Sequence, residues 1–440
     1  MYFKDIIIGF IVALILLMVA LGVRNFVTNE FNRKYFLPAL LFKMVGALLL
    51  GLLYHFYYGG GDTFTYFTRG AIHIYDAFWD KPMLAWHLLF GETDYGHGVY
   101  NYASKIWMYN DPSSYIIVRI AAFISLFVGG SYVATSLVFA VLSFTGIWAM
   151  YVSFVKLFPG KEWHLALAIL FIPSTVFWGS GILKDTVTFG FLGWATTAFI
   201  YLIYGKTKRV VWLVVLGFSL FVIYKIKIYI VMSLLPAMIL WAYFVYIKKV
   251  SNPVARFMIA PFVIAITVIL SGYAVYTVGV DNKKYAVENL AKTVRVTAYD
   301  VGRFTGKNAG SRYDLGDLDD SLVGMLKLGP AAINVALFRP YLWEVSNPLM
   351  LLASLEGLVF FIVLMMIIVR SRYNLWGVLS NPAIIFSLIF SLTFAFAVGI
   401  STYNFGTLFR YKVPLMPFFG IFLAIAWVST TTASKEEKNV

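Results

Sequence analysis

The sequence contains no cysteine, which excludes disulfide bonds and thiolate metal sites. No glycine-rich nucleotide-binding motif stands on a strand–helix unit. Histidines are few and scattered, and they lack a zinc-ligand spacing such as His-Glu-x-x-His. The sequence therefore predicts neither a nucleotide site nor a zinc centre. The histidines considered are His55, His73, His87 and His97.

Charged residues are also scarce, at 13% of the chain, whereas a soluble domain carries roughly 25%. Hydrophobic residues make up 61%, and apolar runs of about 20 residues recur, as in a multi-span membrane protein. The alternating pattern of a barrel is absent, so we expect helices. The sequence predicts an all-α, polytopic transmembrane helical bundle that forms one integral membrane domain over residues 1–440.

We expect about eleven spans plus one re-entrant or interfacial segment. That segment, 115–132, is short and is interrupted by Arg119 and a glycine pair. The first apolar run has no small-residue cleavage site and is expected to be a retained span. The expected spans are 6–23, 37–58, 134–156, 164–178, 186–204, 209–225, 229–247, 255–279, 347–369, 378–399 and 411–430.

Lysine and arginine concentrate in the short loops between alternate spans, which predicts that these loops are cytoplasmic. Much of the net charge of +14 is then explained by the basic residues that orient the spans in the membrane, and no nucleic-acid partner is expected. If 115–132 does not cross, the N-terminus lies outside and the C-terminus is cytoplasmic. We expect a location in the inner or plasma membrane. Two long loops face outward: 59–114 with juxtamembrane helices, and 281–346 with an amphipathic helix from Ser321 onward.

Asp62 opens the first outer loop, in "GGGDTFTYF". A helix starting at Thr63 would show Asp62, Tyr66 and Arg69 on one face. The carboxylate could act as a general base or as a ligand for Mg²⁺ or Mn²⁺. The alternative is that Asp62 only caps a helix.

Lys184 and Asp185 follow the small-residue turn in "FIPSTVFWGSGILKD", where we expect Pro173 to end a short span. Free N–H groups at a helix start, beside a lysine, would hold a phosphate. The alternative is that Asp185 caps the next span while Lys184 reaches the membrane surface.

Further cations are predicted at the outer face. Arg410 and Lys412 precede the last span, and Lys225 and Lys227 lie there against the positive-inside rule. Together they suggest a pocket for a phosphate or pyrophosphate. The alternatives are headgroup anchoring, or a wrong topology near residue 226. The cations of this predicted pocket are Arg119, Lys184, Lys225, Lys227, Arg410 and Lys412.

Glu356 lies within a predicted span, where a carboxylate is either functional or a buried structural group. Lys43 is expected to reach the cytoplasmic surface. Arg339 and Glu344 could pair where the chain re-enters the membrane. A cluster of carboxylates is interpreted as a solvated turn: Asp314, Asp317, Asp319 and Asp320.

Three stretches, taken in order, resemble a known family: "GGGDTFTYF"; "KLFPGKEW" followed by "FIPSTVFWGSGILKD"; and "RYKVPLMP". They look like the GT-C superfamily of multi-span glycosyltransferases and its relatives among polysaccharide polymerases. The stretch "RPYLWEVSNPLMLLASLEGL" resembles bacterial membrane proteins of surface-polysaccharide pathways.

The resemblance implies transfer of a sugar or glycan from a polyprenyl-phosphate-linked donor to a glycan or lipid acceptor at the outer face. It makes Asp62 the base, or the ligand of a divalent cation if one is used. It makes Lys184, Arg410 and Lys412 phosphate contacts, joined by Arg119 and Lys225. The supporting residues would be Tyr66, Arg69, Asp185, Arg339 and Glu356.

The chain departs from the family pattern. It has an extra early span, no second acid beside Asp62 and no soluble C-terminal domain, so a metal-free mechanism stays open. A polymerase would use the same parts. A lipid-linked glycan flippase or transporter is the alternative of another class, although no internal repeat supports it.

Overall fold

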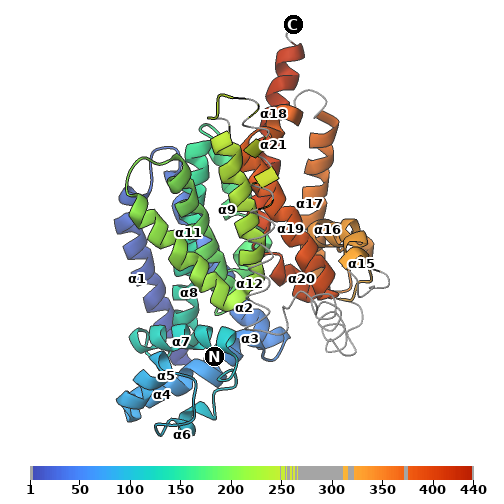
Figure 1. The fold of residues 1–440 in the computed structure, drawn as a ribbon. Helices are drawn as coiled ribbons and strands as arrows, with labels where there is room; N and C mark the ends of the chain where they lie inside the picture. The colour runs from blue at the N-terminus through green and yellow to red at the C-terminus, as the bar shows by residue number, and fades with distance from the viewer. Residues whose placement is uncertain are drawn as a thin grey trace. The chain divides into compact units, whose positions relative to one another are not determined.

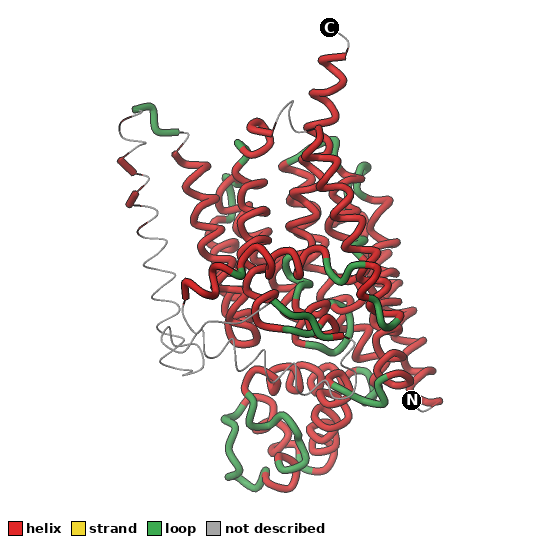
Figure 2. Tube along the Cα trace, turned by 90° about the vertical axis from the view of Figure 1, so that its right-hand side faces the viewer, coloured by secondary structure: helices red, strands yellow, loops and turns green. Residues whose placement is uncertain are grey.

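The computed structural model describes residues 3–247, 249–252, 254, 258–259, 261–262, 265, 311–315, 322–370 and 375–438. Over these residues the chain is largely helical and carries no strand (Figure 2). One isolated bridge joins Arg312 and Asn404. It divides into two compact units. The first comprises Met1–Glu162 and Leu170–Ile228, and the second comprises Trp163–Ile169 and Tyr229–Val440.

Seven helices in the described residues are long and apolar enough to span a membrane, and a bent pair of helices would make an eighth if the pair forms one span. They confirm a polytopic helical bundle. The expected span 255–279 lies largely outside the described residues. The seven are α1 (Phe3–Val27), α2 (Arg33–Leu52) with the π-turn η1 (Leu53–Tyr57), α8 (Tyr132–Leu157), α11 (Lys184–Tyr204), α12 (Arg209–Ile247), α17 (Pro348–Arg370) and α19 (Pro382–Thr402).

Helix α8 is the centre of the first unit, since α1, α2 and α11 all pack against it. Small residues allow the closest approach. A methyl group on Gly190 would lie 2.8 Å from the Cα of Ser143, and one on Gly146 would strike the Gly190 carbonyl. Glycine at such contacts lets membrane helices pack backbone to backbone. The pair α8–α11 therefore forms a tight core.

Short helices gather at one end of this bundle (Figure 1). We call them the 59–127 segment. They pack mainly on one another, with α4 against α5 and α7. The elements are α3 (Asp62–Tyr66), the π-turn η2 (Phe67–Ala71), α4 (Ile72–Asp80), α5 (Pro82–Phe90), α6 (Tyr100–Ala103) and α7 (Pro112–Phe127).

Helix α7 covers residues 115–127 of the predicted re-entrant or interfacial stretch 115–132. It has 16 residues, fewer than the about 20 that a span needs. Asp111, just before it, contacts Lys184 at the start of α11. Ser131, just after it, donates to Asp5 at the start of α1. These contacts tie the two ends of α7 to the starts of α11 and α1.

The expected span 164–178 is wrong as a single helix. The structure has α9 (Glu162–Leu170) and α10 (Pro173–Trp178), separated by two non-helical residues. Pro173 does not end a helix but starts α10, because proline fits the first helical position, where its missing N–H is not needed.

In the second unit, α16 packs against α19 and α17, and α21 packs against α19 and α17. The helix expected to lie on the membrane from Ser321 is instead two short ones, and the second, α16, buries Ala332 and Val335. Residues 281–310 and 316–321, with Asp317, Asp319 and Asp320, lie outside the described residues. The elements not yet given are α15 (Leu322–Lys327), α16 (Gly329–Phe338), η6 (Leu342–Glu344), α18 (Leu375–Leu379), α20 (Phe405–Tyr411) and α21 (Met416–Lys438).

The last predicted span, 411–430, begins in a bend. Helices α20 and α21 meet at 71° and together form the bent pair. Arg410 lies in the last turn of α20, and Lys412 lies in the turn that joins the two helices. The basic residues expected at the mouth of a straight span therefore occupy the break in a bent one.

Candidate functional site

The glycine triplet sets the position of Asp62. Gly59, Gly60 and Gly61 have φ values of 65°, 142° and 124°, a region of backbone conformation that residues other than glycine rarely adopt. Gly61 also lies so close to the Tyr54 ring that an added Cβ would come within 2.6 Å of it. The chain turns there, and α3 begins at Asp62 with Gly61 as its N-cap. Asp62 is therefore not the N-cap, and its side chain is half-buried.

We expect Gly61→Ala to destabilise the protein more than Gly60→Ala does. Both replacements impose backbone strain, of about 1–3 kcal/mol. Only Gly61→Ala adds a clash, because a methyl group on Gly60 meets nothing within 4 Å. Overpacking of this kind costs about 1–3 kcal/mol. Thermal unfolding of the two variants in detergent measures the difference, and equal unfolding temperatures would contradict the described contact with Tyr54.

The predicted shared face of Asp62, Tyr66 and Arg69 is wrong. Helix α3 ends at Tyr66 and the chain continues as a π-turn, in which Arg69 has non-helical dihedral angles. The extra residue in a π-turn changes the helical phase. Tyr66 is buried, whereas Arg69 is exposed with its guanidinium 5.3 Å from the centre of the Trp107 ring.

Lys184 contacts the 59–127 segment. Its Nζ donates to Ser113 Oγ at 2.7 Å and lies 3.5 Å from Asp111 Oδ2. Asp111 caps α7 by accepting from the Ser113 N–H. Burial alone would raise the pKa of Asp111, but hydrogen bonds from Ser114 and Ser113 and the charge of Lys184 outweigh it and lower the pKa to about 2. An anion bound at Lys184 would compete with this carboxylate.

Replacement of Asp111 by asparagine is expected to lower stability at neutral pH by about 1 kcal/mol or less, because solvent screens the exposed carboxylate. The pKa of Asp111 in the folded chain lies below its ordinary value of 3.8. The carboxylate therefore stabilises the fold above about pH 5, and this contribution is lost as the pH falls from about 4 to about 2. Unfolding temperatures of the wild-type and variant proteins should converge over that range. A constant gap down to pH 2 would contradict the assignment.

Asp185 and Lys227 form a buried ion pair, with side chains 0% and 6% exposed. Lys227 is the residue at which α12 leaves helical geometry, with φ −146° and ψ 79°. Two expected spans thus meet at this kink, which lies at the same end of the first unit as Lys184. Lys225, two residues earlier, is exposed beside the Phe221 and Tyr224 rings. The two lysines therefore do not share one pocket.

Arg119 has a partner that the sequence did not reveal. Its Nε donates to the Leu88 carbonyl at 3.0 Å, and its guanidinium also donates to the Gly91 carbonyl. These carbonyls end α5, where a cation satisfies backbone groups left open by the helix. The structure places Arg119 in this role at the end of α5.

The expectation for Lys43 is wrong. Its side chain is 3% exposed and donates to the carbonyl of Gly179, in the turn before Lys184. Its ammonium lies 4.8 Å from the centre of the Phe189 ring. Close packing by glycines brings the turn onto α2, so Lys43 points inward rather than to the membrane surface.

Helix α2 with η1 fixes both of the stretches that we singled out in the first unit. Lys43 binds the turn that precedes Lys184, and a methyl group on Gly181 of that turn would strike Leu50. Tyr54, in η1, packs on Gly61 next to Asp62 and lies edge-on to Trp178 of α10, with ring centres 6.4 Å apart. One helix therefore carries the supports of both Asp62 and Lys184.

In the second unit, the predicted pair of Arg339 and Glu344 is confirmed. Arg339 Nε lies 3.1 Å and 2.9 Å from the two carboxylate oxygens, and a second guanidinium nitrogen also contacts the carboxylate. Hydrogen bonding to Glu344 raises the pKa of Arg339. The guanidinium stands 5.6 Å from the centre of the Phe405 ring at the start of α20. The pair braces the entry to α17.

Lys412 is fully buried, 5.4 Å from the centre of the Phe409 ring. Its Nζ has no hydrogen-bond partner among the described residues. The carboxylate of Glu356 in α17 is close enough to act on it electrostatically. Arg410 is half-buried in α20. The second unit contains all four of these residues: Arg339, Glu356, Arg410 and Lys412.

A group of three possible metal ligands escaped the sequence analysis. His87, Asp94 and His97 bring their ligand atoms within 4.8 Å of one another. No helical or strand spacing connects them, because a loop with glycines at 91, 96 and 98 makes the approach. The expectation that the histidines are scattered is wrong for this pair. Asp62 belongs to no such group in the part of the chain that the structure describes.

No protein-family model, no curated protein and no solved structure matches this chain. The resemblance to the GT-C superfamily therefore stays a hypothesis from sequence motifs.

Proposed function

We propose that the chain is a membrane glycosyltransferase that moves a sugar or glycan from a polyprenyl-phosphate-linked donor to an acceptor. The observation that supports this function best is the sharing of one scaffold. The supports of Asp62 and Lys184 both pack on α2 and η1, through Tyr54 for the first and Lys43 for the second. An acid and a phosphate-binding cation on one rigid element suit a transfer reaction.

Each group has a defined task in this reaction. Asp62 takes the proton of the acceptor hydroxyl as its oxygen bonds to the sugar carbon. The bond between that carbon and the phosphate oxygen breaks, and polyprenyl phosphate departs with the electron pair. Lys184 and the N–H groups at the start of α11 stabilise the charge on the departing phosphate. Arg410 and Lys412 remain predicted phosphate contacts from sequence.

A metal-free version of this reaction needs no second acid beside Asp62. Mg²⁺ and Mn²⁺ prefer several oxygen ligands, and the group of three possible metal ligands in the described residues does not include Asp62. A polymerase that joins lipid-linked glycans would use the same acid and the same cation.

Binding of polyprenyl phosphate tests the phosphate site without knowledge of the sugar. We expect the detergent-solubilised protein to bind polyprenyl phosphate more tightly than the uncharged polyprenol. Lys184→Met should lower the affinity of the protein for polyprenyl phosphate by about 10- to 100-fold, since a charged hydrogen bond contributes about 1.5–3 kcal/mol. Lys105→Met is the matched control, because Lys105 is an exposed lysine of the 59–127 segment. Native mass spectrometry measures the affinity of each protein for polyprenyl phosphate and for polyprenol.

Two results would contradict the phosphate site. One is equal affinity for the phosphate and the alcohol. The other is an equal loss in Lys184→Met and Lys105→Met, which would indicate attraction by surface charge alone.

A transporter of lipid-linked glycans is the second candidate, favoured by one feature of the second unit. The bent pair α20–α21 places the buried Lys412 at its break, near Glu356 of α17. Broken helices with ionisable residues at the break occur at transport sites. Translocation of a fluorescent lipid-linked glycan across liposomes, without any new glycosidic bond, would favour this candidate over the transferase.

A further inference from the structure

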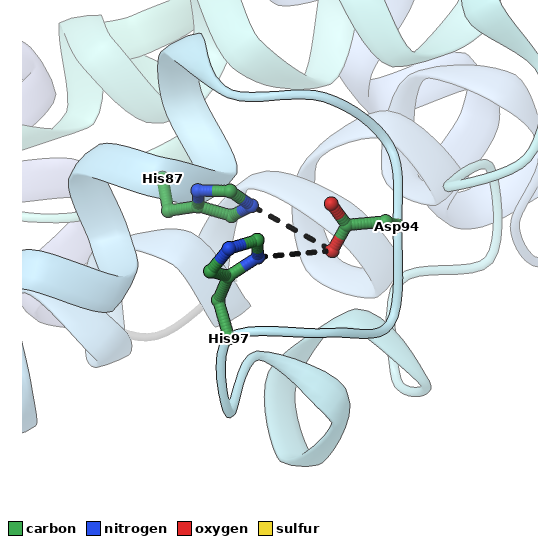
Figure 3. A group of neighbouring side chains, drawn as sticks. All are labelled: His87, Asp94 and His97. Carbon is green, nitrogen blue, oxygen red and sulfur yellow. Dashed lines mark ion pairs between the residues drawn. The ribbon is translucent and has the colours of Figure 1, made fainter.

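The side chains of two histidines and one aspartate come together in the first unit: His87, Asp94 and His97 (Figure 3). His87 Nε2 and His97 Nδ1 each lie 3.7 Å from the same oxygen, Oδ1 of Asp94. The two rings are 4.7 Å apart at an angle of 39°. His87 comes from α5, and the other two residues come from the loop that follows.

The surroundings hold this geometry. Gly91 leaves room for the His87 ring, because an added Cβ would come within 2.8 Å of His87 Nδ1. Arg119 binds the carbonyl of Gly91, and Tyr109 donates to the carbonyl of Asp94. The backbone therefore presents His87 and Asp94 from anchored positions, as a preorganised ligand set requires.

The three side chains make no hydrogen bonds with one another. A distance of 3.7 Å is too long for a hydrogen bond. His87 Nε2 is buried, and it has no hydrogen-bond partner in the described part of the chain. Asp94 Oδ1 does accept a hydrogen bond from the Gly96 N–H at 2.9 Å, which fixes the carboxylate. A buried imidazole nitrogen that faces a fixed carboxylate oxygen without bonding to it has the arrangement of two ligands around an ion.

The distances also suit a small tetrahedral ion. Bonds of about 2.0–2.1 Å to Zn²⁺ place neighbouring ligand atoms about 3.3 Å apart. Each imidazole nitrogen lies 3.7 Å from Asp94 Oδ1, and all three ligand atoms lie within 4.8 Å of one another, so zinc would draw them closer together. Two imidazoles with one carboxylate suit zinc, whereas Mg²⁺ and Ca²⁺ prefer oxygen ligands. We propose that His87, Asp94 and His97 bind Zn²⁺, with the fourth position open to water on the exposed side of His97.

This site is separate from the proposed transferase reaction and holds whether or not that reaction occurs. Asp94 and His97 are both in the loop after α5, so the ion would clamp this loop onto the helix through His87. The expected consequence is greater stability of the 59–127 segment with zinc than without it.

Zinc titration of the full chain tests the site. The protein is purified in detergent without a polyhistidine tag, stripped with EDTA and titrated with Zn²⁺ against a chelating dye. We expect one zinc ion per chain, micromolar or tighter, and a rise in unfolding temperature on its addition. His97→Gln should weaken zinc binding at least 10-fold and abolish that rise, and His87→Gln and Asp94→Asn should do the same. His73→Gln and His55→Gln are the matched controls, since neither residue belongs to the cluster.

His97→Gln is the decisive variant, because the His97 side chain is 70% exposed and its loss should leave the fold intact. Stoichiometric binding by this variant with wild-type affinity would overturn the proposal. So would failure of the wild-type protein to bind zinc at 100 µM, or an equal loss in the variant His73→Gln.

Discussion

Asp185→Leu and Lys227→Met, each made alone, are expected to destabilise the protein by about 3–5 kcal/mol. Each leaves the other member of the pair inside the first unit, where both side chains are almost completely removed from solvent. The cost arises from the uncompensated partner rather than from the lost attraction. The pair also holds the kink of α12 against the start of α11.

Removal of both charges should cost far less than either single change. The double variant Asp185→Leu/Lys227→Met leaves no buried charge, and such replacements of buried ion pairs are often neutral or stabilising. Lys225→Met is the matched control, because Lys225 is exposed, and we expect a change within about 0.5 kcal/mol. Thermal unfolding in detergent and the yield of monodisperse protein measure all four variants. Additive effects of the two single changes would rule out the pair.

Asp62→Asn is expected to reduce glycan transfer by about 10²- to 10⁴-fold, the usual contribution of a general base. The amide has almost the same shape, but it cannot take the proton of the acceptor. We expect little change in the unfolding temperature, since Gly61 and not Asp62 occupies the N-cap of α3. Asp76→Asn is the control, because Asp76 is an exposed carboxylate of α4 in the same segment.

The measurement is turnover of a lipid-linked donor by membranes that contain the variant, together with its affinity for polyprenyl phosphate. Lost turnover with unchanged affinity supports a proton-transfer role. Unchanged turnover would exclude Asp62 as the base. Loss of translocation in the absence of any transfer product would instead favour the transporter.

The long apolar helices could be predicted from sequence because lipid imposes a simple requirement. A run of about 20 apolar residues satisfies its own backbone only as a helix, and α1, α8, α17 and α19 fall where such runs were found. The segment 164–178 shows the limit of this reasoning. Its hydropathy is high, but Pro173 restarts the chain as a new helix, and hydropathy does not register a break.

The side-chain environments were much harder to predict. Lys225 and Lys227 look equivalent in sequence, yet one is exposed and the other is buried against Asp185. That difference depends on a residue 42 positions away. The hydrogen bonds of Arg119 to the end of α5 likewise depend on how separate segments pack. Pairings of this kind leave no periodic signal in a single sequence.

The approach of α8 to α11 has a mechanical consequence. Where Gly146 and Gly190 face each other, no layer of side chains separates the two backbones. Two helices in such contact cannot slide or roll without collision of main-chain atoms, so they move together as one rigid body. Any opening of the first unit must therefore occur elsewhere, at joints such as the one near Lys227.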